Sequence, residues 1–514
     1  MCKRYILGID IGTSGCKSII VDEKGKVVGS SVIEYPLSTP ELGWAEQNPL
    51  DWWEACKISV KKVLNESNIP VTHLAGLGLS GQMHGLVVLD KEYSILRPAI
   101  LWCDQRTSKQ CETITEAVGG ESKLLELINN RMLPGYTAGK ILWIRQNEPY
   151  IYDSAKIFLN PKDYIRFMLT NEFATDVTDA SGTGLFDVKH RKWSEKILNI
   201  LDIPKSKLPK CFESVEVTGR ITKRIAKEVG LPEGLPIVAG GGDAVIQTTG
   251  TGLIKQGIVG TIIGTAGIVA MGMEGYQLNR DGNLQMFCNN TSSTWHVMGV
   301  TLSAGGSYRW YRDALCEDQK REAIKGGTSV YNILEKLAST SQPGSKNLLY
   351  LPYLAGERCP YADPLARAAF IGLTLQHTRA DITRAVMEGV VFSLRQVMEL
   401  ITSMDQAVGV SEIRTSGGGS LSKTWRQIQA DIFQVPIKTF SGGSEGGAYG
   451  AALIAGAGCG IWNSVQDAIK LLELETENIP NVNNKHVYDE LYGIYKELYP
   501  ILKNVNNKLS IIKN

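Results

Sequence analysis

The chain has 514 residues, enough for two large domains, and its 43% hydrophobic and 21% charged residues are ordinary for a globular protein. A formal net charge of +1 gives neither the basic footprint of a nucleic-acid-binding protein nor a polybasic membrane surface. The sequence has no signal-peptide core, no apolar run of transmembrane length and no C-x-x-C pair among ten cysteines, so we expect a cytoplasmic protein with reduced thiols and with neither nucleic acid nor membrane as a partner.

The first 200 residues alternate short apolar runs with helical periodicity. A helix is expected over 51–65, and residues 106–199 are expected to be mostly helical. The apolar runs predict strands over residues 5–11, 18–21, 26–33, 74–79, 86–90 and 99–102. The first three form a meander that turns at 23–25. This mixed pattern is typical of an α/β domain with a central sheet.

A glycine-rich turn in the middle of the chain carries a single carboxylate. Residues 236–239 predict a buried strand, Gly240–Gly242 follow it, and Asp243 opens a small-residue helix over 244–252. Glycines let the backbone approach a ligand closely, and a carboxylate after a strand end can accept a proton or orient a metal ion. The alternative is an ordinary strand-to-helix turn with Asp243 as a helix cap.

The second half repeats the alternation of strands and helices. Strands are predicted over 258–263, 268–271, 295–301 and 412–415, and helices over 380–404, 425–433, 442–458 and 485–503. The glycine- and alanine-rich helix 442–458 is suited to close packing, and helix 485–503 is expected to be a polar surface helix. The strand over 412–415 ends in a second glycine turn, Gly417–Gly419.

Two strand–Gly-Thr–strand turns lie about half the chain apart, at Gly12-Thr13 and Gly264-Thr265. Their backbone N–H groups and hydroxyls could hold phosphate oxygens. The sequence lacks a G-x-x-x-x-G-K-[ST] loop, so a nucleotide would be held in another way. The duplication predicts an α/β fold of two ribonuclease H-like domains, as in actin, hexokinase and Hsp70 ATPase, with a cleft between them.

Long motifs resemble those of the FGGY carbohydrate kinases over nearly the whole chain. They are GIDIGTSGCK (8–17), GLSGQMHG (78–85), RPAILWCDQRT (97–107), LPGYTAGKILWIRQNEP (133–149), LNPKDYIRFMLTNEFATDVTDASGTGLFD (159–187), VAGGGDA (238–244), LPYLAGERCP (351–360), SGGGSLSKTWRQIQADI (416–432) and GGSEGGAYGAALIAGAG (442–458). Within the family, Gly-Gln-Met-His-Gly is typical of members that act on xylulose. The resemblance implies an N-terminal domain over 1–250 on the sugar side and a C-terminal domain over 251–514 on the nucleotide side.

The resemblance also implies roles for individual residues. Asp243 is the implied general base, and Asp10 with Asp243 is implied to hold Mg²⁺. The implied sugar-site residues are Met83, His84, Trp102, Asp104 and Asp243. The residues implied to bind ATP are Thr13, Ser14, Lys17, Gly264, Thr265, Gly305, Gly418, Gly419 and Lys423. The implied partners are a small sugar and ATP, with a homodimer as one expectation for the assembly.

One position departs from the family pattern. Family members that act on xylulose usually carry Asn after the catalytic Asp, and this chain has Ala244, whose methyl group cannot bind a sugar hydroxyl. The implied reaction is ATP-dependent phosphorylation of D-xylulose to D-xylulose 5-phosphate. Gluconate, ribulose and L-xylulose stay open as alternative substrates. A non-catalytic sugar sensor on the same fold is a further alternative, which the presence of Asp243 disfavours.

Overall fold

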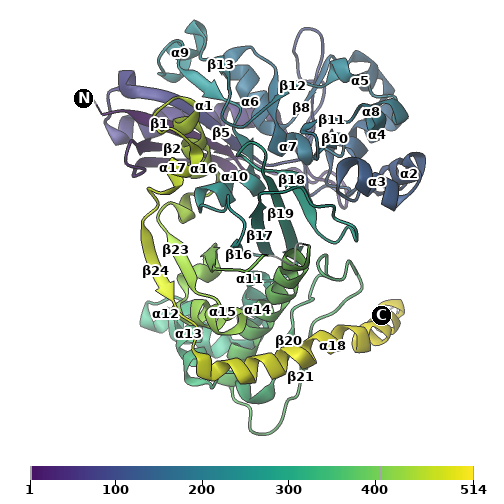
Figure 1. Ribbon diagram of the computed structural model, residues 1–514, viewed down its shortest axis with the longest axis vertical. Helices are drawn as coiled ribbons and strands as arrows, with labels where there is room; N and C mark the ends of the chain where they lie inside the picture. The colour runs from purple at the N-terminus through teal and green to yellow at the C-terminus, as the bar shows by residue number, and fades with distance from the viewer. Residues whose placement is uncertain (1–2, 405–407, 513–514) are drawn as a thin grey trace. The chain divides into compact units, whose positions relative to one another are not determined.

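The computed structural model describes residues 3–404 and 408–512, and the chain forms two compact units (Figure 1). Unit 1 comprises Met1–Ile254, Met273–His296 and Glu445–Leu472. Unit 2 comprises Lys255–Gly272, Val297–Ser444 and Glu473–Asn514. Both units are therefore discontinuous in sequence, because the chain leaves and re-enters each of them.

The main sheet of unit 1 grows from an N-terminal meander. Strands β1 (Tyr5–Ile11), β2 (Gly15–Asp22) and β3 (Val27–Glu34) pair antiparallel, which confirms the three strands and the turn expected from the sequence. The strand order is β13-β14-β5-β1-β2-β3. The added strands are β5 (Leu74–Gly81), β13 (Val217–Arg220) and β14 (Pro236–Val238), and β15 (Gly241–Gly242) also pairs with β5.

Three parallel strands end at one edge of this sheet. Strands β1 and β15 both run parallel to β5, and Asp10 of β1 and Gly241 of β15 are each in register with Ser80. The carboxyl ends of β1, β5 and β15 therefore lie together, and polar residues that follow such strand ends are placed to bind ligands. Helix α10 (Asp243–Gly250) begins directly after β15, as the sequence predicts.

Helices cover both faces of the sheet. Helix α1 (Pro49–Ser67), predicted over 51–65, buries two tryptophans and packs on β2 and β3. Helix α16 (Gly447–Gly458) packs on β1, β5 and α10, so the prediction that this small-residue segment serves packing is confirmed. The contact is close, since a Cβ at Gly78 would lie 2.0 Å from the carbonyl oxygen of Ala451.

The other elements of unit 1 are mostly helices, with short strands among them. Its helices are α2 (Ser108–Val118), α3 (Glu121–Ile128), α4 (Thr137–Asn147), α5 (Pro149–Ser154), α6 (Pro161–Thr170), α7 (Val177–Ser181), α8 (Glu195–Ile200), α9 (Lys223–Val229) and α17 (Val465–Ile469). Its strands are β4 (Glu46–Gln47), β6 (Val87–Leu89), β7 (Ala99–Ile100), β8 (Ile157–Leu159), β9 (Ala174–Asp176), β10 (Phe186–Asp187), β11 (Lys192–Trp193), β12 (Lys210–Phe212) and β18 (Gln285–Cys288).

Unit 2 repeats the core arrangement of unit 1. Strand β16 (Ile258–Ile263) is antiparallel to β17 (Gly267–Met273) and parallel to β22 (Glu412–Ser416), just as β1 is antiparallel to β2 and parallel to β5. The two Gly-Thr turns thus occupy equivalent hairpins. The order β19-β17-β16-β22-β23-β24 adds β19 (Trp295–Thr301), β23 (Ile437–Phe440) and β24 (Leu474–Asn478). The predicted two-domain α/β duplication is confirmed.

Helices surround the sheet of unit 2. They are α11 (Gly305–Leu315), α12 (Glu317–Gly326), α13 (Val330–Thr340), α14 (Arg379–Ser403), α15 (Lys423–Phe433) and α18 (Lys485–Ile511), with strands β20 (Leu349–Leu351) and β21 (Ala369–Ile371) beside them. Among the helices of residues 3–404 and 408–512, none has the length and apolar character needed to cross a membrane.

The C-terminal helix differs from the sequence prediction. Helix α18 was expected to be polar, but it buries one face that includes Tyr488, Tyr492, Tyr495 and Tyr499. Tyrosines spaced three and four residues apart form a stripe along one face of the helix. Lysines and asparagines elsewhere on the helix make its overall composition polar, so composition alone does not reveal this stripe. The hydroxyl groups of Tyr488 and Tyr499 donate to Glu388 and Asp363, so the buried face is hydrogen-bonded as well as packed.

The close packing of α16 makes a prediction about stability. A Cβ at Gly450 would lie 2.0 Å from the carbonyl oxygen of Ile246, whereas a Cβ at Gly493 in α18 meets no atom within 4 Å. Gly450→Ala should lower the free energy of unfolding by roughly 1–3 kcal/mol through overpacking. Gly493→Ala, the matched control, should raise it by up to about 1 kcal/mol because alanine favours a helix. Chemical denaturation measures both, and an unchanged Gly450→Ala protein would contradict the packing.

Candidate active site

Two carboxylates meet at the carboxyl edge of the sheet in unit 1. Asp10 comes from β1, and its Oδ1 accepts a 2.6 Å hydrogen bond from the Ser80 hydroxyl of β5. Asp243 is the first residue of α10, and its Oδ1 accepts a 2.7 Å bond from the Ala244 N–H. A Cβ at Gly447 would lie 2.8 Å from Asp10 Oδ1, so this glycine lets the N-terminus of α16 approach the same carboxylate.

The electrostatics of this pair favour a proton or a cation. Desolvation first, and the negative charge of Asp10 second, raise the pKa of Asp243 to about 7. Hydrogen bonds from the backbone of Ala244 and Met83 oppose that rise. Desolvation also raises the pKa of Asp10, against the Ser80 hydrogen bond and the charge of Lys17. A carboxylate with a pKa near neutrality can accept and release protons at physiological pH.

A buried relay fixes the backbone that carries Asp243. The Gly242 N–H donates to Thr178 Oγ1 at 2.9 Å, and Thr178 Oγ1 donates to Asp176 Oδ2 at 2.6 Å. Asp176 Oδ1 in turn lies 2.9 Å from Lys162 Nζ. Since a hydroxyl has one proton, its bond to Asp176 leaves the Thr178 lone pairs directed at Gly242. Arg166 holds the preceding residues by donating to the carbonyl oxygens of Val238 and Ala239.

The segment after β5 presents Met83 and His84 in a constrained conformation. His84 has φ +68°, a left-handed backbone conformation that residues other than glycine rarely adopt. Its carbonyl oxygen accepts bonds from Lys140 Nζ (2.7 Å) and Thr137 Oγ1 (3.1 Å). Its ring donates from Nδ1 to the Gly182 carbonyl oxygen at 2.6 Å and lies 4.8 Å from the Tyr136 ring.

Lys140 is buried, and desolvation lowers its pKa to about 7. Besides His84, its ammonium group binds the Gly135 carbonyl oxygen at 2.5 Å. Met83 is buried, and a Cβ at Gly242 would touch its side chain. Lys140 and Thr137 thus hold the His84 backbone, and Met83 links this segment to the glycine turn before Asp243.

The first Gly-Thr turn contacts a partly exposed tryptophan. The indole Nε1 of Trp102, whose residue is 44% exposed, donates to Thr13 Oγ1 at 2.9 Å. Thr13 Oγ1 also bonds to Gln82 Oε1 at 3.4 Å. Ser14 is exposed at the tip of the turn, and Lys17 forms a 2.7 Å ion pair with Glu445. Trp102, Thr13 and Gln82 therefore form one polar group beside Asp10.

Asp104 occupies a different kind of environment. It is fully buried, and its carboxylate accepts bonds from the Ala45 N–H (2.7 Å) and the Arg106 guanidinium (2.7 Å). The Arg106 guanidinium also stacks on the Trp44 ring with its Cζ atom 3.5 Å from the ring centre. Asp104, two residues after Trp102, is therefore bonded within the protein.

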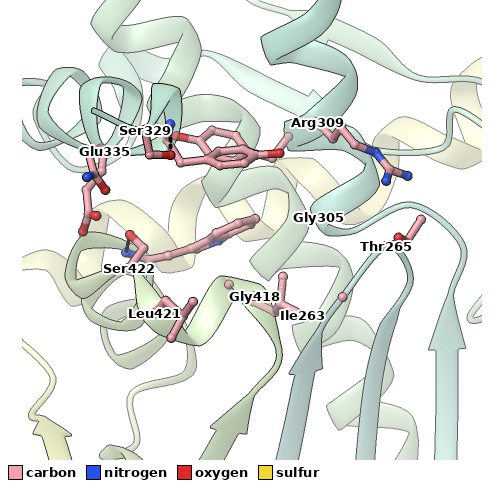
Figure 2. Close-up of a pocket in the computed structure, with 15 residues that line it drawn as sticks. Ile263, Thr265, Gly305, Arg309, Ser329, Glu335, Gly418, Leu421 and Ser422 are labelled. Carbon is pink, nitrogen blue, oxygen red and sulfur yellow. Dashed lines mark hydrogen bonds between the residues drawn. The ribbon is translucent and has the colours of Figure 1, made fainter. Parts of the chain in front are cut away.

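Unit 2 contains a pocket of about 490 Å³ at the second Gly-Thr turn (Figure 2). Of the residues predicted to bind a nucleotide, Gly264, Thr265, Gly305, Gly418 and Gly419 line it. Lys423, the first residue of α15, is exposed and is not among the lining residues of this pocket. A Cβ at Gly305 would lie 2.4 Å from the Gly264 carbonyl oxygen, so glycine permits the close contact of α11 with the turn.

The two ends of the pocket differ in chemistry. Figure 2 shows Thr265, Gly305 and Arg309 at one end, and Ser329 and Glu335 at the other. Three aromatic residues line it, with the Tyr308 ring centre 5.6 Å from that of Tyr331 and 5.2 Å from that of Trp425. Aromatic walls suit a flat ring, and glycine-rich turns at the other end suit phosphate groups.

Sequence reasoning missed several residues of both sites. In unit 1 these are Tyr136, Lys140, Thr178 and Asp176. They lie within the family motifs given above, but no pattern in the sequence marks them individually. In unit 2 they are Tyr308, Arg309, Ser329, Tyr331, Asn332, Glu335, Leu421, Ser422 and Trp425. Helices α11, α13 and α15 supply most of the unit 2 residues, and their sequences show only ordinary amphipathic spacing.

Comparison with known proteins gives a consistent result over the whole chain. The N-terminal domain of the FGGY family of carbohydrate kinases matches residues 5–250, and the family's C-terminal domain matches residues 260–459. The chain is 35% identical to a xylulose kinase from Bacillus subtilis, over 98% of this chain and 99% of that protein. It is 31% identical to a gluconokinase from the same organism, over 97% of this chain and 96% of that protein.

The fold is similar to that of solved structures in the same group. A ligand-bound xylulose kinase from Lactobacillus acidophilus superposes with a TM-score of 0.90 at 27% identity, covering 98% of this chain and 100% of that one. The two-unit α/β architecture described above is therefore shared with proteins of this group along their full length.

The relay through Thr178 makes a testable prediction. Thr178→Val keeps the side-chain shape but removes the hydroxyl, which leaves the Gly242 N–H without this acceptor and takes one of its hydrogen bonds from Asp176. The free energy of unfolding should fall by roughly 1–3 kcal/mol. Thr178→Ser, which keeps the hydroxyl, should recover most of that loss. Chemical denaturation of the three proteins checks this. Equal stability of the Val and wild-type proteins would show that the hydrogen bonds of Thr178 do not stabilise the fold.

Proposed function

The chain belongs to the FGGY family of carbohydrate kinases and is a phosphotransferase that acts on a sugar, and on that premise we propose that it converts D-xylulose to D-xylulose 5-phosphate with ATP and Mg²⁺. Unit 1 would hold the sugar and unit 2 the nucleotide. The observation that carries this proposal is Asp243, a carboxylate with a pKa of about 7 beside Asp10 at the carboxyl edge of the sheet.

Asp243 has the properties of a general base. Phosphoryl transfer to a sugar needs a group that accepts the proton of the attacking hydroxyl, and a base is most effective when its pKa is near the working pH. Burial and the neighbouring Asp10 charge give Asp243 that pKa. The relay from Lys162 through Asp176 and Thr178 to Gly242 would hold the carboxylate in position.

The same carboxylates fit a magnesium ion. Mg²⁺ in kinases is bound by one or two carboxylates, with phosphate oxygens and water completing its shell. Asp10 and Asp243 supply two carboxylates whose mutual repulsion a divalent cation would relieve. Within residues 3–404 and 408–512, no group of three or more Asp, Glu, His or Cys side chains is arranged so that it could hold a metal ion. The ion, when bound, neutralises charge on the transferred phosphate.

The pocket of unit 2 supports ATP as the phosphate donor. We propose that Tyr308, Tyr331 and Trp425 enclose the base, while Gly418, Gly419 and Gly305 allow the backbone to approach the ribose and phosphates. Thr265 and Gly264 would bind phosphate oxygens, and the equivalent turn in unit 1, Thr13 and Ser14, would do the same with support from Lys17. Lys423, exposed beside Ser422, would contribute positive charge at the pocket rim.

For the sugar, the proposal rests on Met83, His84, Trp102 and Asp243. Asp104 would act indirectly, by anchoring the loop of Trp102. The buried lysines next to these segments bind groups within the protein: Lys140 binds carbonyl oxygens, and Lys162 binds three aspartates. Because these two lysines already bind groups of the protein, they are not placed to bind the carboxylate of gluconate, and this favours a neutral sugar. Ribulose and L-xylulose, also neutral, are the alternatives that a substrate panel separates.

Removing the proposed base should abolish transfer. Asp243→Asn should lower kcat by about 10²–10⁴-fold while ATP binding persists. In the wild-type protein kcat should fall as the pH drops below about 7, because Asp243 becomes protonated. A variant with near-normal kcat at saturating sugar would refute the assignment.

Stability provides an independent readout of the same carboxyl group. A folded-state pKa of about 7, against 3.8 for the ordinary group, means that the folded protein binds more protons between these pH values. Stability from this group is therefore lost as the pH rises towards 7. The stability difference between Asp243→Asn and wild type should shift in favour of the variant from pH 5 to pH 8, as measured by chemical denaturation.

The position after the base tests the identity of the sugar. If D-xylulose is the substrate, Ala244→Asn should be tolerated or should lower KM by up to about tenfold, since one net hydrogen bond is worth roughly 0.5–1.5 kcal/mol. The measurement is ADP release by both proteins with D-xylulose, L-xylulose, D-ribulose and gluconate. Strong wild-type activity on gluconate with little on xylulose would overturn the xylulose proposal. If no ADP is released with any of the four sugars, the result would favour a sensor.

A further inference from the structure

The Thr13 hydroxyl lies between a group that can only donate to it and an atom that can only accept from it. The indole Nε1–H of Trp102 donates to Thr13 Oγ1 at 2.9 Å, and an indole offers no acceptor in return. The Gln82 Oε1 atom lies 3.4 Å from Thr13 Oγ1, beyond the roughly 2.7–2.8 Å that is usual for an O–H···O bond. The hydroxyl proton therefore points away from the indole and is only weakly held.

A buried chain of side-chain amides fixes the orientation of Gln82. The indole N–H of Trp52 binds Gln47 Oε1 at 3.0 Å, so the amide nitrogen of Gln47 faces the Thr13 carbonyl oxygen at 2.8 Å. Gln82 Nε2 donates to the same Gln47 Oε1 at 3.0 Å, which leaves Gln82 Oε1 as the atom that faces Thr13. Trp52, Gln47 and Gln82 are all buried, so the core of unit 1 makes Gln82 an acceptor towards Thr13.

The backbone of Trp102 is held firmly although 44% of the residue is exposed. Its loop binds Ala45 on both sides, because the Leu101 N–H donates to the Ala45 carbonyl oxygen at 3.0 Å. The Asp104 carboxylate accepts from the Ala45 N–H at 2.7 Å. A Cβ at Gly135 would lie 2.6 Å from the Trp102 carbonyl oxygen, so the loop is closely packed as well. A side chain on a backbone this constrained can keep its N–H directed at one acceptor.

We propose that Trp102 is a positioning residue for phosphate transfer, which directs the Thr13 hydroxyl proton at a phosphate oxygen of ATP. This inference rests on the proposed function, in which the first Gly-Thr turn binds phosphate. A phosphate oxygen is negatively charged and accepts a stronger hydrogen bond than the neutral Gln82 carbonyl, so the weakly held hydroxyl would rotate towards it. Donation by the indole also polarises the hydroxyl, which strengthens the bond that the hydroxyl donates.

This role differs from the sugar contact that the family resemblance implies for Trp102. A sugar would contact the exposed ring, whereas the indole N–H is already bonded to Thr13. The two roles can be separated, because Trp102→Phe keeps an aromatic ring but removes the donor. Loss of a contact between ring and sugar would raise the KM for sugar, whereas loss of the N–H should impair the use of ATP.

A double-mutant cycle of steady-state kinetics tests the proposal. At a saturating concentration of the sugar that gives the fastest ADP release, Trp102→Phe should lower kcat/KM for ATP by roughly three- to tenfold, as expected for one lost hydrogen bond. In a Thr13→Val background, where the hydroxyl is already absent, the same substitution should cost less than about twofold. In a Thr13→Ser background, which keeps the hydroxyl, the full loss should return.

Trp462→Phe is the matched control. The Trp462 indole N–H donates to the Glu23 carbonyl oxygen at 3.0 Å. Both residues belong to unit 1, and Glu23 lies at the opposite end of β2 from Thr13. This variant also loses one indole hydrogen bond, but it should leave kcat/KM for ATP unchanged.

Equal losses from Trp102→Phe in the wild-type and Thr13→Val backgrounds would overturn the proposal, as would a change confined to the KM for sugar or the same loss in the control. If circular dichroism shows that Thr13→Val is unfolded, Thr13→Ala replaces it, and the two KM values of Trp102→Phe alone still decide. A wild type that releases no ADP with any of the four sugars refutes the proposed function and this inference together. An active wild type with an additive cycle refutes this inference alone.

Discussion

The site in unit 1 depends on two like charges held close together at the ends of parallel strands. Asp10 and Asp243 would repel each other less in water, but their enclosure raises the pKa of both. The protein sustains this unfavourable arrangement through the register of β1, β5 and β15, through the Ser80 hydroxyl, and through the approach of α16 at Gly447. A pair of carboxylates under such constraint is ready to take up a proton or a divalent cation.

Around the pair, buried charges act on the backbone more than on a ligand. Lys162, Arg166 and Lys140 are all fully or nearly fully buried, and each binds carbonyl oxygens or carboxylates of the protein itself. Their bonds fix the Gly240–Gly242 turn and the left-handed His84. Buried ionic networks contribute little net stability, and these bonds hold the segments that carry Asp243 and His84 in one geometry.

Unit 2 repeats the strand pattern of unit 1 but has different residues at its strand ends. Its hairpin β16–β17 and strand β22 repeat β1, β2 and β5, but different residues follow the matching strand ends. Gln82, Met83 and His84 follow β5, whereas Gly417–Gly419 follow β22, and Gly418 and Gly419 line the pocket with aromatic walls. One arrangement of strands thus carries a pair of carboxylates in unit 1 and an aromatic-walled pocket in unit 2, because different residues follow the strand ends.

The sequence alone determined the local structure and the reaction class. Alternating apolar runs and glycine turns located β1, β2, β5, β16 and β22, since strand pattern and turn chemistry are local properties, and the placement of Asp243 after a strand end identified it as a candidate base. Tertiary structure decided what depends on residues far apart in the chain. Only packing shows that α16 returns to unit 1, that Thr178 reaches Gly242, or that the tyrosines of α18 are buried. The physical reason is that these features are contacts between distant segments, and periodicity in one segment shows an apolar face without showing what covers it.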